Sequence, residues 1–215
     1  MTRYRVGVDV GGTFTDVVLM DDGSGLTVKK VLSTPHDYSE AILEALEDLL
    51  REHGAEGDRI EAVIHGTTVA TNALLTRTGA KTGLITTRGF RDVLEFARLR
   101  LGRLYDMDWE RAAPLVPRYL RTEVEERIGA NGQIVTPLDM ASVARAVRSL
   151  LAEQVDSIAV CLLHAYRNPA HEEEIGRYLA AEAPGVFVSL SSAVLPEIRE
   201  FERTSTTVVK AYIQP

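Results

Sequence analysis

The first third of the chain alternates apolar and polar residues over three short stretches, which predicts three β-strands. The stretches are 4–10, 15–20 and 26–32, and each has the two-residue period of a half-buried strand. The polar segment 21–25, which contains two glycines, is typical of a turn between the second and third stretches. We therefore expect an antiparallel meander of three strands.

Helical spacing of apolar residues begins after this meander. A helix is predicted over 35–53, with Thr34 as its cap and Gly54 just beyond its end. Its apolar residues fall on one face: Ile42, Leu43, Leu46, Leu49 and Leu50. A short strand, a helix and a further strand are expected next: 62–65, 68–77 and 81–86. This alternation of strands and helices is typical of an α/β fold.

A second group of elements occupies residues 122–213. A hairpin is predicted at 122–136 around the turn 129–132, and Pro137 is expected to open the next helix. The remaining elements are a strand, a helix capped by Asn168, a strand and a final helix: 157–163, 169–183, 186–190 and 197–213. Because the sequence stops at Pro215, we expect the apolar face of the final helix to need a partner elsewhere, as in a fragment or a separately expressed domain.

Residues 88–121 follow neither pattern. The segment holds the only tryptophan of the chain, Trp109, together with several arginines. It is either an insertion that offers a surface to a partner or substrate, or an irregular connection packed on the core.

Composition narrows the class of protein. The 215 residues are 45% hydrophobic and 26% charged, which is ordinary for a globular protein. The net charge of −7 argues against binding to nucleic acid or to an anionic membrane. The single cysteine, Cys161, lies in an apolar run and is expected to be a core thiol. No signal peptide and no apolar run of about 20 residues is visible, so a soluble, cytoplasmic protein is expected.

Chemistry-bearing residues gather first at 8–16, where a turn joins the first two predicted strands. Gly11 and Gly12 are expected to supply backbone angles that other residues disfavour and to leave N–H groups open to a phosphate. Thr13 and Thr15 would add hydroxyl groups. Asp9 and Asp16 are carboxylates of the kind that hold Mg²⁺. An ordinary hairpin turn is the alternative. The motif is neither a P-loop nor a dinucleotide fingerprint.

A second polar group lies at 65–73, where a predicted strand ends and a helix begins. Free N–H groups at a helix start favour an anion, and Thr67 and Thr68 would complete its shell. Simple capping by one of these threonines explains the pattern equally well. A lone histidine such as His65 is more often a hydrogen-bonded residue at a strand end than a catalytic base. Asn72 lies one turn into the helix, where it could point toward the same pocket.

Both motifs together show that the sequence resembles the N-terminal part of the hydantoinase/oxoprolinase family. The resemblance rests on Asp-Val-Gly-Gly-Thr-Phe-Thr-Asp at 9–16, on the block 65–73, and on a third block, 191–207, which begins Ser-Ser-Ala-Val-Leu-Pro-Glu. It implies an α/β structure, the N-terminal lobe of the sugar kinase/Hsp70/actin (ribonuclease H-like) ATPase fold, with a mixed sheet and packed helices. It also implies a family N-terminal domain at 1–190 and the start of a following domain at 191–215.

The resemblance further implies ATP and Mg²⁺ as cofactors and the ATP-dependent opening of cyclic amides such as hydantoins or 5-oxoproline. In such enzymes ATP is thought to phosphorylate an amide or enol oxygen and so create a leaving group. Asp9 would lie near Mg²⁺, and Asp16 and His65 would be the catalytic candidates. The nucleotide-binding residues would be Gly11, Gly12, Thr13, Thr15, Thr67, Thr68 and Asn72. Positioning and charge neutralisation would supply most of the catalysis.

Family members continue well past this region, with a second lobe that carries the other phosphate loop and the adenosine pocket. The expected partners are therefore that lobe, a hydantoinase B-type subunit and a small-molecule substrate, and the chain alone is expected to be inactive. A ketone carboxylase subunit, a small-molecule kinase and a non-catalytic assembly domain are the alternatives. The sequence does not distinguish a hydantoin, oxoproline or ketone substrate.

Overall fold

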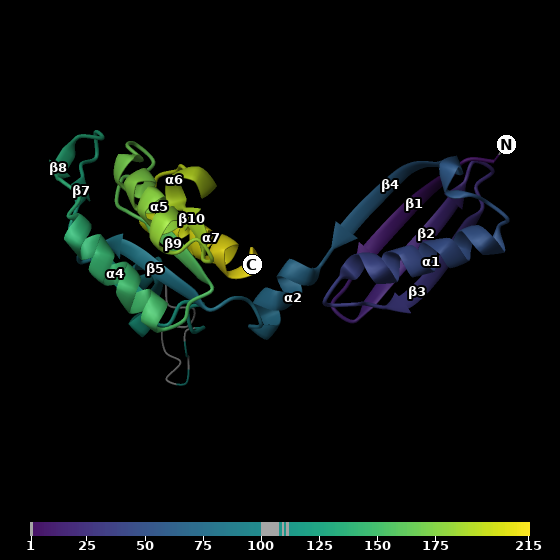
Figure 1. Ribbon diagram of the computed structural model, residues 1–215, viewed down its shortest axis with the longest axis horizontal. Coiled ribbons are helices and arrows are strands. Elements are labelled where there is room, and N and C mark those ends of the chain that lie inside the picture. Colours follow the sequence, from purple (N-terminus) through teal and green to yellow (C-terminus); the bar gives the residue numbers. More distant parts are fainter. Residues whose placement is uncertain (1, 100–107, 109, 111) are drawn as a thin grey trace. The chain divides into compact units, whose positions relative to one another are not determined.

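The chain forms two compact units, Met1–Thr76 and Arg77–Pro215, each with its own sheet (Figure 1). The computed structural model describes residues 2–99, 108, 110 and 112–215. The division falls at the end of the second predicted helix, one residue before its predicted last residue, Arg77. Each unit has a separate hydrophobic core.

The sheet of the first unit contains four strands. These are β1 (Tyr4–Val10), β2 (Phe14–Asp21), β3 (Leu26–Leu32) and β4 (Ile60–Thr67), in the order β3-β2-β1-β4. β2 is antiparallel to both β1 and β3, which confirms the predicted meander, and β4 lies parallel to β1. β4 is longer than the predicted strand because its pairing with β1 continues to Val10.

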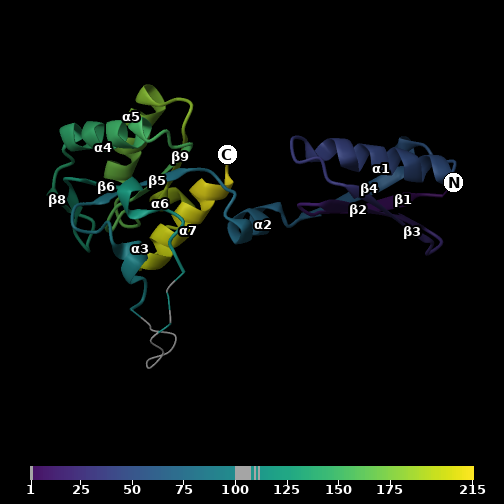
Figure 2. The same cartoon turned by 90° about the horizontal axis from the view of Figure 1, so that it is seen from below.

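Helix α1 (Tyr38–Glu52) lies along one face of this sheet, as Figure 2 shows. The inward residues of the strands alternate with exposed ones and pack against it: Val6, Val8, Val10, Val17 and Leu19 with Ala45 and Leu49. The helix begins later than predicted, because the cap is the side chain of Asp37, which accepts a hydrogen bond from Ser39 N at 2.9 Å. Gly54, with φ +56, follows its end as expected.

The sheet of the second unit is entirely parallel. It contains β5 (Thr82–Thr87), β6 (Arg121–Val124), β9 (Ser157–Cys161) and β10 (Phe187–Leu190), in the order β10-β9-β5-β6. Every residue of β5 and β9 is buried, as is typical of a parallel sheet covered by helices on both faces.

The predicted hairpin at 122–136 is partly wrong. Residues 121–124 pair with β5 and belong to the parallel sheet. Only the next part forms a hairpin, in which β7 (Arg127–Ile128) pairs with β8 (Ile134–Thr136). The turn includes Gly132 at φ +88, a backbone conformation that glycine adopts without strain.

Helices α3 (Val93–Phe96), α4 (Met140–Ala152), α5 (Ala170–Glu182), α6 (Ser191–Val194) and α7 (Glu200–Ile213) accompany this sheet. The first unit also contains a short 3₁₀ turn at Gly57–Arg59 and helix α2 (Val69–Thr76). The second unit contains a 3₁₀ turn at Arg118–Leu120. α4 starts at Met140 and not at Pro137, because the Asp139 side chain accepts from Ala141 N and Ser142 N. Asn168 does accept from Ala170 N at 3.1 Å, as predicted.

The final helix does not need a partner elsewhere for its apolar face. Val208 and Ala211 of α7 are buried in the core beside β9, and Tyr212 packs so closely on Gly79 that a Cβ there would lie 2.2 Å from its ring. The expectation of an unpaired face was therefore wrong. Residues 191–215 pack within the second unit, and a family boundary between 190 and 191 stays a prediction. Cys161 is buried, as expected of a core thiol, and burial raises its pKa.

The irregular segment 88–121 is described only in part. Its described portion carries α3, and Arg118 makes two hydrogen bonds to the carboxylate of Asp92, at 2.9 and 3.0 Å. Trp109, the only tryptophan of the sequence, lies outside the described residues. No helix among those that the structure describes is long and apolar enough to cross a bilayer.

Candidate functional site

The residues of the first motif form a three-residue turn between β1 and β2. β1 ends at Val10 and β2 begins at Phe14, which leaves Gly11, Gly12 and Thr13 between the strands. The register pairs Val10 with Thr15 and Asp9 with Asp16. Gly11 N donates to the carbonyl of Phe14 at 3.0 Å and closes the turn. The motif therefore folds back on itself within the first unit.

Glycine is needed here for space and not for backbone angles. Neither Gly11 nor Gly12 has a positive φ, so the expectation about unusual angles was wrong. A Cβ on Gly11 would lie 2.8 Å from the carbonyl oxygen of Phe14, and one on Gly12 would lie 3.1 Å from Nδ2 of Asn72. Any side chain at Gly11 would push the turn open.

The turn leaves two backbone donors free. Among the residues that the structure describes, no acceptor is bonded to the N–H groups of Gly12 and Thr13. Both residues are exposed. Successive free N–H groups at an exposed turn are the arrangement that binds anions.

The second motif brings the start of α2 to the same turn. Thr68 N donates to the carbonyl of Val10 at 3.0 Å, and the hydroxyl of Thr67 donates to the same oxygen at 3.2 Å. Thr67 Oγ1 also accepts from Val69 N at 3.2 Å, so this threonine caps the helix, as the capping interpretation predicted. The N–H groups of Ala70 and Thr71 in the first turn of α2 have no acceptor in the described part of the chain.

Asn72 links the two motifs. Its Nδ2 donates to Thr68 Oγ1 at 3.4 Å, and the same atom is the one that a Cβ on Gly12 would approach. The turn Gly11–Gly12–Thr13 and the start of α2, with Thr68 and Asn72, are called the phosphate corner below. The prediction that the two motifs lie together is therefore supported by direct contacts.

Asp9 and Asp16 are cross-strand neighbours on the sheet face opposite α1. Lys30 of β3, opposite Asp16 in the register, forms an ion pair with it at 2.8 Å and lies 5.4 Å from the centre of the Phe14 ring. No group of three metal-ligating side chains occurs in the described ranges. An Mg²⁺ ion here would depend on these two carboxylates, water and phosphate oxygens, which is how the small, strongly hydrated ion is commonly held.

Two predicted residues do not join this face. His65 pairs with Val8, whereas Gly66 pairs with Asp9, so the alternation of the strand places His65 and the two aspartates on opposite faces. Thr15 is fully buried, and its hydroxyl lies 2.9 Å from that of Ser33. A direct contact of Thr15 with phosphate does not fit this position.

Ser33 is the residue that the sequence did not single out. Its N donates to the carbonyl of Thr13 at 2.9 Å, and its hydroxyl donates to the carbonyl of Gly11 at 2.8 Å. The available signal was its place directly after β3: once Phe14 pairs with Leu32, the next residue must lie opposite Thr13.

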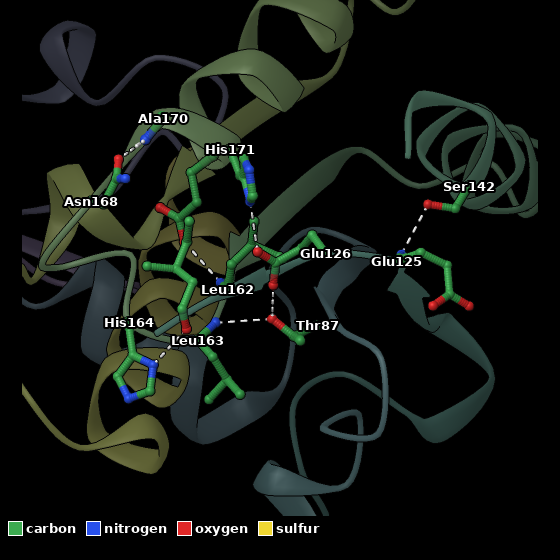
Figure 3. Close-up of polar contacts among 12 residues, drawn as sticks. Thr87, Glu125, Glu126, Ser142, Leu162, Leu163, His164, Asn168, Ala170 and His171 are labelled. Atoms are coloured by element: carbon green, nitrogen blue, oxygen red, sulfur yellow. Dashed lines mark hydrogen bonds and ion pairs between the residues drawn. The ribbon is translucent and has the colours of Figure 1, made fainter. Parts of the chain in front are cut away.

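A second polar cluster lies at the strand ends of the second unit, and Figure 3 shows part of it. Glu126 accepts hydrogen bonds from the Thr87 hydroxyl and from His171 Nδ1, the latter at 2.8 Å, and Leu163 N donates to Thr87 Oγ1 at 3.0 Å. Glu172 accepts from Leu162 N, the Ser191 hydroxyl and Ser192 N. These side chains are buried and satisfy one another, as in a structural network.

Comparison with known proteins gives a consistent result. The family model described as hydantoinase/oxoprolinase N-terminal region matches residues 5–183. The chain is 41% identical, over 99% of its length, to caprolactamase subunit alpha of Pseudomonas jessenii, and 36% identical, over 97%, to the acetophenone carboxylase gamma subunit of Aromatoleum aromaticum. It covers 32% and 31% of these relatives, about a third of their length.

Solved structures agree. The ATP-dependent caprolactamase of P. jessenii superposes with a TM-score of 0.85 at 41% identity over 99% of this chain. Nucleotide-free acetone carboxylase gives 0.87 at 28% identity over the whole chain, and in both cases 32% of the other chain is covered. The predicted fold, the N-terminal lobe of the sugar kinase/Hsp70/actin type with a mixed sheet and packed helices, is confirmed.

Proposed function

The chain belongs to the hydantoinase/oxoprolinase family, and on this basis we propose that it is the ATP-handling N-terminal region of an ATP-dependent cyclic-amide hydrolase. The observation that carries the proposal is the phosphate corner, where the N–H groups of Gly12 and Thr13 have no acceptor among the described residues and Asn72 of α2 lies beside Gly12. The 41% identity to a caprolactamase subunit favours a cyclic amide as substrate. Backbone donors at an exposed turn that no protein group satisfies are hydrated by water, which an anion can replace.

In this proposal the backbone donors of the corner hold the β- and γ-phosphates of ATP. The hydroxyl groups of Thr13 and Thr68 and the side-chain amide of Asn72 surround them. Thr67 acts less directly, because its hydroxyl proton is donated to the Val10 carbonyl and the residue holds the start of α2 in place. Asp9 binds Mg²⁺ directly or through water, and Asp16 either joins it or acts as general base. ATP supplies an activated phosphoryl group for the amide oxygen, and the residues of this chain orient it and offset its negative charge.

Thr15 and His65 have different places in the proposal. Thr15 supports the turn from inside the core through Ser33. The catalytic role of His65 stays a prediction, and it requires a substrate that reaches the α1 side of β4.

The chain spans about a third of the length of its relatives. We therefore propose that the active enzyme also needs a second lobe, of the kind that the longer relatives have room for, and a second subunit of the hydantoinase B type. Both relatives are named as subunits of enzymes, which supports an assembly. In this proposal the second lobe holds the adenosine, so residues 1–215 alone are expected to bind nucleotide weakly.

Titration of the 215-residue chain with Mg-ATP, followed by amide signals in two-dimensional NMR, tests the proposal. We expect saturable binding weaker than submicromolar, with the largest shifts at Gly12, Thr13, Ala70 and Thr71. Absence of shifts at these amides at millimolar Mg-ATP would contradict the phosphate corner. Submicromolar affinity would contradict the need for a second lobe.

An ATP-dependent ketone carboxylase is the second candidate. The TM-score of 0.87 with acetone carboxylase and the 36% identity to an acetophenone carboxylase subunit favour it. In the assembled enzyme, ATP hydrolysis stimulated by a cyclic amide supports the hydrolase. Stimulation only by a ketone with bicarbonate supports the carboxylase, and a stable phosphorylated product would indicate a small-molecule kinase.

A further inference from the structure

Ser33 makes two hydrogen bonds to the turn between β1 and β2 and one to Thr15 of β2, although it lies about twenty residues away in the sequence. Its N–H donates to the carbonyl of Thr13 at 2.9 Å and extends the pairing of β2 with β3 by one residue. Its hydroxyl donates to the carbonyl of Gly11 at 2.8 Å, and the hydroxyl of Thr15 lies 2.9 Å from it.

The direction of these hydrogen bonds follows from the number of protons. A serine hydroxyl has one proton, and that of Ser33 is donated to Gly11 O. The Thr15 hydroxyl must therefore be the donor in its contact with Ser33. The result is a chain from Thr15 through Ser33 to the Gly11 carbonyl, in which each bond polarises the next. Thr15 is fully buried, so this chain is also the partner that its hydroxyl needs.

The Gly11 carbonyl fixes the direction of the next N–H. A trans peptide is planar, and its C=O and N–H point in opposite directions. No cis peptide occurs in the described residues. Because Ser33 holds the Gly11 carbonyl on its own side of the turn, the N–H of Gly12 points away from Ser33. That N–H is one of the two donors that have no acceptor in the described part of the chain.

Because both residues are glycines, the peptide between Gly11 and Gly12 needs a contact such as that of Ser33 to fix its orientation. A Gly–Gly peptide has no Cβ on either side to restrict its rotation, so it can turn over at low cost. Ser33 is the only side chain bonded to the Gly11 carbonyl among the residues that the structure describes.

We propose that Ser33 is a positioning residue for the phosphate corner: by holding the Gly11 carbonyl it presents the N–H of Gly12 to a phosphate, an inference that rests on the proposed function. Ser33 itself contacts no phosphate. Its effect passes through one peptide plane. The residue thereby connects a buried hydroxyl chain to the exposed donor of the turn.

The first test measures the peptide direction without any ligand. Residual dipolar couplings in the ¹⁵N-labelled chain report the orientation of the Gly12 N–H bond relative to the rest of the first unit. We expect Ser33→Ala to change the Gly12 coupling strongly, while Ser33→Thr, which keeps the hydroxyl, restores the wild-type value. An unchanged Gly12 coupling in Ser33→Ala overturns the proposal.

The second test measures binding, with Mg-ATP and with inorganic pyrophosphate as probes. Ser33→Ala is expected to bind roughly three- to tenfold more weakly, the cost of about one hydrogen bond, and to lose the Gly12 shift on titration. Ser33→Thr should bind like the wild type. Ser39→Ala is the matched control, because it removes a hydroxyl of the same unit whose one partner among the described residues is Asp37. Equal weakening by Ser39→Ala would overturn a specific role.

A double variant separates positioning from folding. Ser33→Ala leaves the buried Thr15 hydroxyl without its partner, whereas Thr15→Val with Ser33→Ala removes both polar groups. We expect the double variant to recover thermal stability but not affinity, since the Gly11 carbonyl still lacks its donor. Recovery of wild-type affinity overturns the proposal. If the wild type binds neither probe but its Gly12 coupling depends on Ser33, the proposed function fails and the positioning stands.

Discussion

The two units place polar groups at the ends of their strands in opposite ways. In the first unit, the N–H groups of Gly12 and Thr13 are exposed and lack acceptors among the described residues. In the second unit, the carboxylates of Glu126 and Glu172 are buried and accept hydrogen bonds from the neighbouring strand ends and helices. Both arrangements look alike in the sequence, as clusters of hydroxyl, carboxyl and histidine side chains near strand ends.

The difference indicates which cluster can bind a ligand. A buried network that satisfies its own donors has nothing left to offer, and it stabilises one arrangement of the chain. An exposed turn with unbonded donors contributes little to stability and keeps its binding capacity. Substitutions in the second unit should therefore affect unfolding, and those at the phosphate corner should affect nucleotide affinity.

The largest effect is expected for Glu172→Ala. Glu172 is fully buried, and its loss leaves the N–H groups of Leu162 and Ser192 and the Ser191 hydroxyl without their acceptor. We expect a decrease of about 3–5 kcal/mol in the free energy of unfolding of the second unit. Denaturant titration measures it, with Glu173→Ala, the exposed neighbour, as control. Equal stability of the two variants would remove the structural interpretation of this cluster.

Asp9→Asn tests the opposite behaviour in the first unit. Asp9 is exposed and its side chain has no hydrogen bond in the described part of the chain, so the free energy of unfolding should change little. Affinity for Mg-ATP should fall about tenfold, because the amide binds Mg²⁺ less well than a carboxylate. The comparison needs titrations with and without Mg²⁺, and Asp22→Asn serves as a control at the other end of the sheet. A loss that is the same without Mg²⁺ would exclude a metal role for Asp9.

The pH dependence of stability should also differ between the units. Burial raises the pKa of Glu172 above its usual 4.5, although its hydrogen bonds oppose this. The folded state then binds the proton more tightly than the unfolded chain, so this stabilisation is complete below pH 4.5 and is lost as the pH rises through the raised pKa. The melting temperature of the wild type minus that of Glu172→Gln should therefore shrink as the pH increases. A growing difference would show that the hydrogen bonds outweigh burial.

The alternation of apolar and polar residues predicts both the bounds of the strands and the face on which each side chain lies. Strands β1 and β3 have the predicted bounds, since each has a clear two-residue period over a covered face. The same period places Thr15 inside with Val17, and His65 on the other face from Gly66. Residue type and spacing predicted that Thr15 and His65 belong to the site. Their odd or even positions along the strands place both side chains on the face that α1 covers, away from the two aspartates.

Other features depend on contacts that no local pattern shows. Ser33 reaches the turn only because Phe14 pairs with Leu32, a register that the three-strand meander sets as a whole. Glu172 lies in an acidic run at a helix start, which is typical of a solvated face, and packing against β9 and α6 buries it. α7 likewise finds its apolar partners in strands that are far away in sequence.

The smallest effect separates two adjacent lysines of β3 that point to opposite faces of the first sheet. Lys29 pairs with Asp48 of α1 at 2.6 Å, and Lys30 pairs with Asp16 at 2.8 Å. Lys30→Met leaves the charge of Asp16 uncompensated near the phosphate corner, and we expect about two- to threefold weaker binding of Mg-ATP, an effect that disappears at high salt. Lys29→Met should leave affinity unchanged, and at most about 1 kcal/mol of stability should be lost in either variant. If both substitutions weaken binding equally, the charge on the open face has no special relation to the nucleotide, and the backbone donors of the turn carry the binding without it.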